Sequence, residues 1–579
     1  MKLGKFCLAV LIPAVVLANR AAAQTPHAAA PAKPARKAAP AVSPSRPKLV
    51  VLLVVDQMRG DYIDKFEGQW TGGLKRLVRE GAWFREAAYP YAATETCVGH
   101  STIATGALPA THGMVANAWW DRDAGKIVTC TFDPQASNIA YGGAPTPEGD
   151  SARRMLVPAF AEELRLQSGG ATRIVTFSLK ARAAITMAGH KADAVTWFEN
   201  GFWTTSTAFG SMPFVEGFAK AHPVASDWGK TWSLSLPESS YLYDEKATGA
   251  VAPGGWELMF PHPLRGKPDS SGPDAAFYLQ WATSPYADRY LTKMAEDAVD
   301  QLGLGKSGGT DFLGVSYSSV DYVGHAFGPR SWEIQDVLVR LDKDLDELFQ
   351  HLDRKVGRGN YVVALSADHG VVPTPEDMQK TGVDAGVLHV PVLSERIEKA
   401  LEPFNYPKPA IARVAGSEVY FSPGTYDRLK TDPAAARAVL EAIRSVPGVR
   451  EVYRAEEVQD RPATESPLRK AEALGYFPDR SGDLLIVPKP YYLVAGAPEG
   501  KPRDFGTGHG TPYYYDQHVP VVFMGWGVEH GEYFGPVTPA DIAPTLAALC
   551  GVTLSSGDGR VLSEALHASK KAKPAAPLR

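Results

Sequence analysis

Residues 48–56 read KLVVLLVVD, an unbroken run of branched apolar side chains between a lysine and an aspartate. A run of this length and composition predicts a strand that is buried on both faces, as the central strands of a parallel sheet are. Ligands of open α/β sheets bind outside the carboxyl ends of the strands. Asp56, which ends the run, is therefore a candidate binding residue.

Four further runs predict buried strands, and polar residues directly follow three of them. The runs are 174–179, 312–320, 361–367 and 519–524, and the residues after the first three are Lys180, Asp321 and the pair Asp368-His369. Because parallel strands end at one edge of a sheet, we expect side chains from distant parts of the chain to meet there. Carboxylates and imidazoles together indicate a metal site, and a lysine among them indicates an anionic substrate.

The segments between these runs predict helices that cover the sheet. Residues 336–352 place apolar side chains at helical spacing with charged residues between them, and residues 539–549 predict a late helix. The alternation predicts an α/β fold, a doubly wound and mostly parallel sheet flanked by helices. Two segments break it, about 197–285 and 373–504, and we expect these insertions to form a cap over the carboxyl edge.

The two ends of the chain differ in composition from the rest. Lysines at positions 2 and 5, an apolar run over 6–18 and three alanines at 21–23 predict that residues 1–23 are an export signal. Residues 24–47, rich in Ala, Pro and Lys, predict a linker, 48–566 the catalytic domain, and 567–579 a flexible tail. No run is long and apolar enough for a membrane anchor. We expect an exported protein, periplasmic or extracellular.

Composition excludes one class of partner and leaves the cysteines undecided. The formal net charge of −4 predicts no nucleic-acid-binding surface. Cys7 leaves with the signal, and the remaining Cys97, Cys130 and Cys550 allow one disulfide without choosing it. The oligomeric state is not indicated.

Six aspartates and histidines form a candidate metal-binding set. They are Asp56, Asp321, His325, Asp368, His369 and His509. Each has an ordinary interpretation when taken alone: Asp56 as a helix cap, for example, or His509 as a loop histidine bonded to the backbone. Together they supply the carboxylate and imidazole ligands that zinc accepts, in a number sufficient for two ions.

The segment 93–102, ATETCVGHST, offers a nucleophile. Residues 99–105 predict a short helix that Gly106 ends, which places Thr96 near a helix N-terminus, where N–H groups favour a developing oxyanion. Spacing alone does not separate Thr94 from Thr96, and each serves equally well as a capping threonine. We expect Cys97 to be a small packed residue beside the nucleophile. This segment contains no GxSxG elbow, which argues against an α/β-hydrolase.

The order of these motifs resembles the alkaline phosphatase superfamily and, within it, the exported single-chain bacterial alkaline phosphatases of the PafA/PhoK type. The matching motifs are 55–61 (VDQMRGD), 96–100 (TCVGH), Asn117, 180–182 (KAR), Asp321 with His325, 367–370 (ADHG) and 508–511 (GHGT). They run in order through the chain, so the resemblance covers essentially the whole mature domain.

The resemblance implies two zinc ions per chain and a covalent mechanism. The implied ligands are Asp321, His325 and His509 for one ion, and Asp56, Asp368, His369 and the Thr96 oxygen for the other. Thr96 is then the nucleophile, which forms a phosphothreonine that is hydrolysed in a second step.

Three further residues are implied to bind the phosphoryl oxygens: Asn117, Lys180 and Arg182. Lys180 and Arg182 alternate along the chain, so we expect both on the same side of an extended strand end, where they can reach one dianion. Without the metal set, surface charges after a strand would be the ordinary interpretation of this pair.

The resulting hypothesis is a zinc-dependent alkaline phosphatase that hydrolyses a broad range of small-molecule phosphate monoesters. One alternative is a phosphodiesterase or nucleotide pyrophosphatase of the same superfamily, which would lack a cationic pair for a third phosphoryl oxygen. The other is a non-catalytic exported zinc-binding protein, which has no use for a nucleophile or an anion clamp. A sulfatase would need Cys/Ser-x-Pro-x-Arg, which residues 97–101 do not match.

Overall fold

The computed structural model describes residues 46–461, 463 and 465–567. The predicted signal peptide, most of the predicted linker and nearly all of the predicted tail lie outside the described residues. Among the helices that are described, none is long and apolar enough to cross a membrane.

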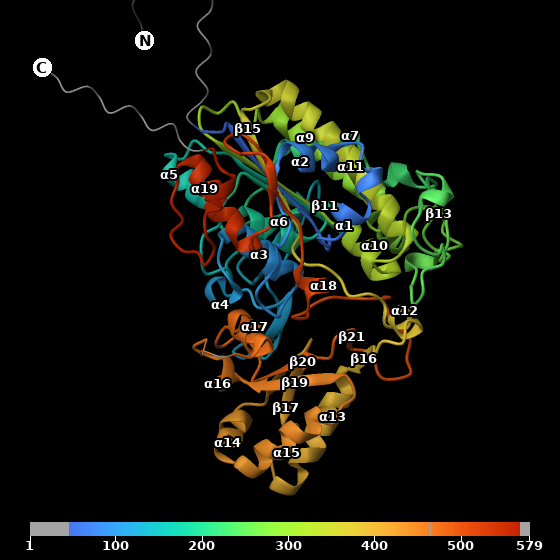
Figure 1. The fold of residues 1–579 in the computed structure, drawn as a ribbon, viewed down its shortest axis with the longest axis vertical. Helices are drawn as coiled ribbons and strands as arrows, with labels where there is room; N and C mark the ends of the chain where they lie inside the picture. Colours follow the sequence, from blue (N-terminus) through green and yellow to red (C-terminus); the bar gives the residue numbers. More distant parts are fainter. Residues whose placement is uncertain (1–45, 462, 464, 568–579) are drawn as a thin grey trace, which may run out of the picture. The chain divides into compact units, whose positions relative to one another are not determined.

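The largest sheet in the described part of the chain has eleven strands (Figure 1). Its order is β23 (Gly531–Tyr533), β2 (Ala82–Phe84), β22 (Val521–Gly525), β15 (Tyr361–Ser366), β1 (Leu49–Val55), β14 (Asp311–Tyr317), β9 (Ile174–Ser178), β10 (Ala194–Glu199), β11 (Phe202–Ser206), β6 (Asn138–Ala140) and β7 (Pro145–Thr146). The strands from β15 to β10 are parallel, whereas β22 and β11 pair antiparallel to their inner neighbours. The predicted α/β sheet is confirmed with a parallel centre, and the antiparallel pairings of β22 and β2 on one side and of β11, β6 and β7 on the other make the whole sheet mixed.

β1 is the strand on which the rest of the sheet is built, and all of its residues are buried. It pairs with β14 from Leu49 opposite Asp311 to Val55 opposite Tyr317, and with β15 on its other side. A strand covered on both faces has no solvent-facing position for a polar side chain, which explains the unbroken apolar run. The matched register also brings the ends of all three strands to the same edge.

Helices cover both faces of the sheet. The odd-numbered residues of β1 pack in one core with α11 (Trp332–Leu352). The even-numbered residues pack in a second core with α6 (Ala181–Ala188) and α19 (Ile542–Cys550). Alternate side chains of a strand point to opposite faces, so a single strand supplies both cores. The predicted doubly wound architecture is therefore confirmed.

Some predicted boundaries are wrong by a few residues. The strand predicted over 312–320 ends at Tyr317, and α10 (Ser319–Phe327) follows, so Asp321 lies in the first turn of a helix. The helix predicted from residue 336 is α11, which already begins at Trp332. Apolar side chains suit a buried strand and the buried side of a helix equally, so composition alone does not mark the change.

The first predicted insertion begins later than predicted. Residues 194–206 form a hairpin in which β11 pairs antiparallel to β10 and extends the sheet. Its turn is Asn200-Gly201, with φ of 51° and 87°, the two-residue turn that joins twisted antiparallel strands. The predicted start at residue 197 is therefore wrong. The Asn200-Gly201 turn was overlooked because the segment is rich in aromatic residues and glycine.

Residues of the second predicted insertion, 373–504, form a small α/β unit with a core of its own. Its sheet has the order β17 (Ile411–Ala415), β18 (Glu418–Phe421), β20 (Leu484–Pro488) and β19 (Val449–Arg454), and α13 (Val390–Leu401) packs against α15 (Pro433–Arg444). These elements are yellow to orange in Figure 1. Arg480 is one of the residues that join this unit to the rest of the molecule: its guanidinium donates to the Arg154 carbonyl at 2.7 Å and lies over the Trp119 ring.

Candidate active site

Polar side chains from distant segments meet at the ends of the central parallel strands. In chain order they are Asp56 after β1, Lys180 after β9, Asp321 and His325 on α10 after β14, and Asp368 with His369 after β15. Asp321 and His325 lie four residues apart on α10 and so project from the same face of that helix. His509 joins them from the loop that follows the second insertion.

Two groups of these side chains are close enough to hold a metal ion. Asp321, His325 and His509 form one group and Asp56, Asp321 and His369 the other, with the ligand atoms of each group within 4.8 Å of one another. Asp321 thus belongs to both groups, and Asp368, an implied ligand, belongs to neither. Asp368 nevertheless lies beside the second group, because its Oδ2 is 3.5 Å from His369 Nε2.

Backbone carbonyls orient the three histidine rings. The Nδ1 atoms of His325, His369 and His509 donate to the carbonyl oxygens of Thr507, Gly370 and Thr94 at 2.8, 2.9 and 2.7 Å. With Nδ1 bonded to the backbone, each ring has Nε2 as the nitrogen that can bind a metal, which is the usual arrangement of a metal-ligating histidine. Burial and the two neighbouring imidazoles hold the pKa of His509 well below its usual value. His509 is therefore neutral, the form that binds a metal.

Buried carboxylate oxygens at this centre lack partners. Asp56 Oδ1 and Asp368 Oδ2 are fully buried and accept no hydrogen bond. Burial raises the pKa of Asp56 well above its usual value, and the charges of Asp321 and Asp368 raise it further. A bound cation would remove both the desolvation cost and the repulsion. The donor set therefore fits divalent metal ions with oxygen and nitrogen ligands, of which zinc is one.

Lys180 places a fixed positive charge between the two groups. Its Nζ lies 2.5 Å from Oδ2 of Asp56 and 2.5 Å from Oδ2 of Asp321. Burial opposes protonation, but the two carboxylates outweigh it and raise the Lys180 pKa. Lys180 caps α6 and Arg182 lies in the first turn of that helix. The predicted extended arrangement of this pair is wrong, because β9 already ends at Ser178.

Thr96 is the first residue of α3 (Thr96–Thr105), the helix that Gly106 ends in the left-handed conformation. Its Oγ1 lies 3.5 Å from His369 Nε2. The Thr94 hydroxyl instead donates to the Thr511 carbonyl at 3.1 Å. The geometry therefore favours Thr96 over Thr94 as the hydroxyl that faces the candidate metal-binding side chains.

Asn117 is held against the first turn of α3. Its Oδ1 accepts a hydrogen bond from the Cys97 N–H at 2.8 Å, and its own N–H donates to Glu95 Oε2 at 2.6 Å. The contact to Oδ1 holds the amide group in place, and its Nδ2 is a donor that can bind an anion. Burial raises the pKa of Glu95, an effect that the Asn117 hydrogen bond and the nearby charge of Arg182 partly oppose. Arg182 itself has a buried Nε without a hydrogen-bond partner.

A disulfide joins Cys97 to Cys130, a pairing that the sequence left undecided. Cys97 is buried directly beside Thr96, as expected, and is in addition bonded to Cys130. The Cys130 N–H donates to the Asn117 carbonyl at 2.9 Å. The bridge and this hydrogen bond together tie the segment that carries Asn117 to the helix that begins with Thr96. Cys550 is free and buried.

Sequence reasoning missed two residues that contact this centre, Gln57 and His100. The Nδ1 of His100 donates to the Thr96 carbonyl at 2.9 Å and lies 3.2 Å from Asp368 Oδ2. Gln57 bonds both Asp321 and Asp368. Both residues lie inside the motifs that carry the family resemblance, and this position was the available signal for them.

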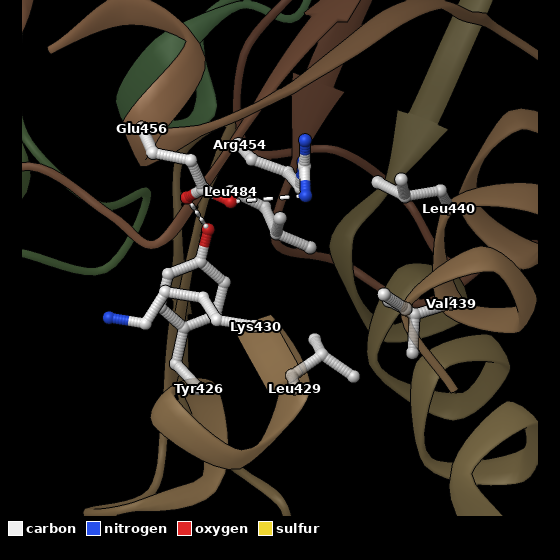
Figure 2. A pocket seen from close by; sticks show the side chains of 9 residues that line it. Tyr426, Leu429, Lys430, Val439, Leu440, Arg454, Glu456 and Leu484 are labelled. Atoms are coloured by element: carbon white, nitrogen blue, oxygen red, sulfur yellow. Dashed lines mark hydrogen bonds and ion pairs between the residues drawn. The ribbon is translucent and has the colours of Figure 1, made fainter. Parts of the chain in front are cut away.

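The small α/β unit contains a separate cavity, shown in Figure 2. Leu429 and Val439 line it together with Tyr426, whose hydroxyl donates to Glu456 at 2.6 Å. Its volume of about 10 Å³ leaves room for one water molecule at most. None of its lining residues belongs to the metal-binding groups, so it does not compete as a substrate site.

Comparison with known protein families and curated proteins gives matches over most of the chain. The family described as type I phosphodiesterase / nucleotide pyrophosphatase matches residues 50–513. Alkaline phosphatase PafA of Elizabethkingia meningoseptica is 34% identical over 536 residues, which cover 90% of this chain and 95% of that protein. Alkaline phosphatase PhoV of Synechococcus elongatus is 32% identical, with 98% of this chain and 100% of that protein covered.

Solved structures show the same fold. A crystal structure of wild-type alkaline phosphatase PafA matches with a TM-score of 0.81 and 32% identity, covering 92% of this chain and 100% of that one. A PafA variant with substitutions of one threonine, one asparagine, one lysine and one arginine gives a TM-score of 0.80, 30% identity and the same coverage. Murine ectonucleotide pyrophosphatase / phosphodiesterase 5 gives 0.50 and 15% identity over 90% of this chain and 100% of that one, which shows a shared fold alone.

Proposed function

The chain belongs to the type I phosphodiesterase / nucleotide pyrophosphatase family of the alkaline phosphatase superfamily, and we propose that it is a zinc-dependent alkaline phosphatase. Its substrates are a broad range of small-molecule phosphate monoesters. The observation that carries this proposal is the Thr96 hydroxyl, which faces a cluster of metal-binding side chains with the Lys180 ammonium among them. Named relatives matched over about nine-tenths of the chain are alkaline phosphatases, which supports the same activity.

The side chains at the centre would hold two zinc ions. Asp321, His325 and His509 would hold one, and Asp56, Asp368 and His369 the other, with the Thr96 oxygen beside the second. The position of Asp321 in both groups supports a compact two-ion centre. When bound, the ions supply positive charge that favours the ionised hydroxyl and stabilises the leaving oxygen.

Thr96 supplies the nucleophile in this proposal. Its hydroxyl loses its proton to solvent as the oxygen attacks phosphorus, the bond from phosphorus to the alcohol oxygen breaks, and the leaving oxygen takes up a proton from water. The place of Thr96 in the first turn of α3 puts the N-terminus of that helix near the charge that develops on the phosphoryl oxygens. Water then hydrolyses the phosphothreonine, which releases inorganic phosphate and restores the hydroxyl.

Asn117, Lys180 and Arg182 bind the phosphoryl oxygens in this proposal. Nδ2 of Asn117 is the free amide donor, and the guanidinium of Arg182 has a buried Nε without a partner. A monoester carries one more charged oxygen than a diester, so the Lys/Arg pair favours monoesters. The family description also covers phosphodiesterases, and this pair is what speaks against that alternative here.

Hydrolysis of an aryl phosphate monoester, compared with the corresponding diester, tests the proposal. Protein that a chelator has verifiably stripped of metal should hydrolyse neither ester, and added zinc should restore activity with a higher kcat/KM for the monoester. A higher kcat/KM for the diester would select the phosphodiesterase alternative. Zinc binding without hydrolysis of either ester would select the non-catalytic zinc-binding protein.

We propose that the activity lies outside the cytoplasm. Residues 1–23 have the composition of an export signal, and a bridge such as Cys97–Cys130 persists in oxidising compartments. Protein recovered from the periplasm or the medium should begin at Gln24, which intact mass spectrometry measures. A mass that retains residues 1–23 would contradict this placement.

A further inference from the structure

Gln57 holds a backbone conformation that residues with a Cβ rarely adopt. It follows Asp56 directly, is fully buried and has φ of 67°, in the left-handed region. Glycine takes up this conformation freely, whereas other residues are strained there. The conformation belongs to a tight turn in which the Met58 N–H donates to the Val55 carbonyl at 3.1 Å. A buried glutamine at a position suited to glycine points to a use for its side chain.

Gln57 bonds carboxylates that come from two different strand ends. Its Nε2 donates to Asp321 Oδ1 at 2.9 Å, and its backbone N–H donates to Asp368 Oδ1 at 3.0 Å. In the proposed function, Asp321 belongs to one zinc site and Asp368 to the other. Gln57 therefore links the carboxylates of both sites without belonging to either group of ligands.

Gly324 leaves the space that the Gln57 amide occupies. It lies on α10 between Asp321 and His325, and a Cβ added to it would lie 1.8 Å from Gln57 Oε1. Any side chain at this position would displace the amide that bonds Asp321. Gln57 Oε1 accepts no hydrogen bond, so Nε2 and the surrounding packing hold the side chain in place.

We propose that Gln57 is a positioning residue of the metal centre, which fixes Asp321 relative to Asp368 and thereby raises the affinity for zinc. The proposal rests on the assignment of these carboxylates in the proposed function. Partners of this kind keep ligands in the orientation that the ion needs, and their loss commonly weakens metal binding by about 10- to 100-fold.

Gln57→Gly tests the proposal, because it removes the side-chain donor while relieving the backbone strain and keeping the N–H bond to Asp368. Zinc affinity is measured by competition with a chromogenic chelator on protein that thermal unfolding shows to be folded without metal. We expect binding to weaken by about 10- to 100-fold. An unchanged zinc affinity would overturn the proposal, since a merely structural role lowers the melting temperature without changing the affinity of the folded protein.

Asn200→Gly is the matched control. Asn200 also has positive φ, at 51°, but lies exposed in the turn between β10 and β11. Its replacement relieves a similar backbone strain without touching the metal centre. Zinc affinity should remain that of the wild type, and a loss as large as that of Gln57→Gly would overturn the proposal.

Gly324→Ala tests the same contact from the other side. The added methyl group should displace the Gln57 amide and weaken zinc binding by a similar factor. In the double variant Gln57→Gly/Gly324→Ala the methyl group no longer meets the amide, so zinc affinity should equal that of Gln57→Gly, even if Gly324→Ala alone fails to fold. A further, multiplicative loss in the double variant would overturn the proposal.

Zinc affinity is read independently of turnover, so the inference and the proposed function fail separately. A wild-type protein that binds zinc but hydrolyses no phosphate ester would refute the function and leave the role of Gln57 standing. Equal zinc affinities of wild type and Gln57→Gly in an active phosphatase would refute the inference alone.

Discussion

Arg182 and Lys180 differ in what they contact. Lys180 Nζ lies against two carboxylates of the metal centre, whereas Arg182 has a buried Nε without a partner and Glu95 as its neighbouring charge. Removing Lys180 would therefore disturb the candidate metal ligands, and removing Arg182 would leave them in place. The selectivity of the anion clamp is best separated from metal binding at Arg182.

Arg182→Ala should lower kcat/KM for an aryl phosphate monoester on the order of 100-fold, because a charge-assisted contact to the transition state contributes a few kcal/mol. Diester hydrolysis should fall much less, and zinc content should not change. Steady-state kinetics on both esters and metal analysis measure these effects, with the exposed Arg79→Ala as the control. An equal loss on both esters would show that Arg182 supports the fold or the metals in general.

Glu472 gives the molecule a pH-dependent stability. It lies on α17 (Pro467–Gly475), where burial raises its pKa from 4.5 to about 8 and the nearby charge of Glu418 adds to the effect. Between these values the folded protein holds a proton that the unfolded chain releases. The free energy of unfolding therefore falls as pH rises from about 4.5 to about 8.

Glu472→Gln should remove this loss of stability. The melting temperature of the variant should be close to that of the wild type at pH 4 and should exceed it increasingly up to pH 9, as thermal unfolding at several pH values will measure. A difference that stays constant over this range would show that the folded-state pKa of Glu472 is not raised.

At the scale of elements, the disulfide joins the first turn of α3 to the residue after β4 (Lys126–Thr129). The two cysteines are 33 residues apart in sequence, and Asn117 lies within the loop that they close. The Asn117 backbone accepts a hydrogen bond from the Cys130 N–H and donates one to the Glu95 carboxylate. Both bonds depend on the segments that this bridge holds together.

Cys97→Ala/Cys130→Ala should lower the free energy of unfolding by about 3–4 kcal/mol through the loop-closure entropy of the unfolded chain. It should also lower monoester kcat/KM, and the loss should be much smaller when Asn117 is already alanine. Denaturant unfolding and this double-mutant cycle check both effects, with Cys550→Ala as the control for loss of a cysteine. The same activity loss in both backgrounds would mean that the bridge does not act through Asn117.

Element types were predictable where one physical demand dominates. β1 needs apolar side chains on both faces and α11 needs one apolar stripe, so their patterns identify them. The change from β14 to α10 was not predictable, because buried strand and buried helix share the same composition there. The helical start of α6 was missed for a similar reason, and with it the placement of Lys180 as a cap.

Over the whole molecule, motif order named the aspartates and histidines that meet at the strand ends, but it did not give their geometry. The strand ends explain why Asp56, Asp321 and Asp368 meet, since parallel strands end at one edge. The carbonyls of Thr507 and Thr94 that orient two of the imidazoles come from backbone far away in sequence. Contacts of this kind depend on the complete tertiary fold, and no local pattern encodes them.

The most direct test of the account is to measure the turnover and the zinc content of Thr96→Ala. These measurements decide whether Thr96 is the nucleophile of a two-metal centre. The variant should lose monoester hydrolysis and still bind about two zinc ions per chain, because the aspartate and histidine ligands survive. Thr94→Ala removes a hydroxyl that in the wild type donates to the Thr511 carbonyl. This variant should keep most of the activity. Near wild-type turnover by Thr96→Ala, measured on metal-replete protein, would contradict the assignment of Thr96 as the nucleophile.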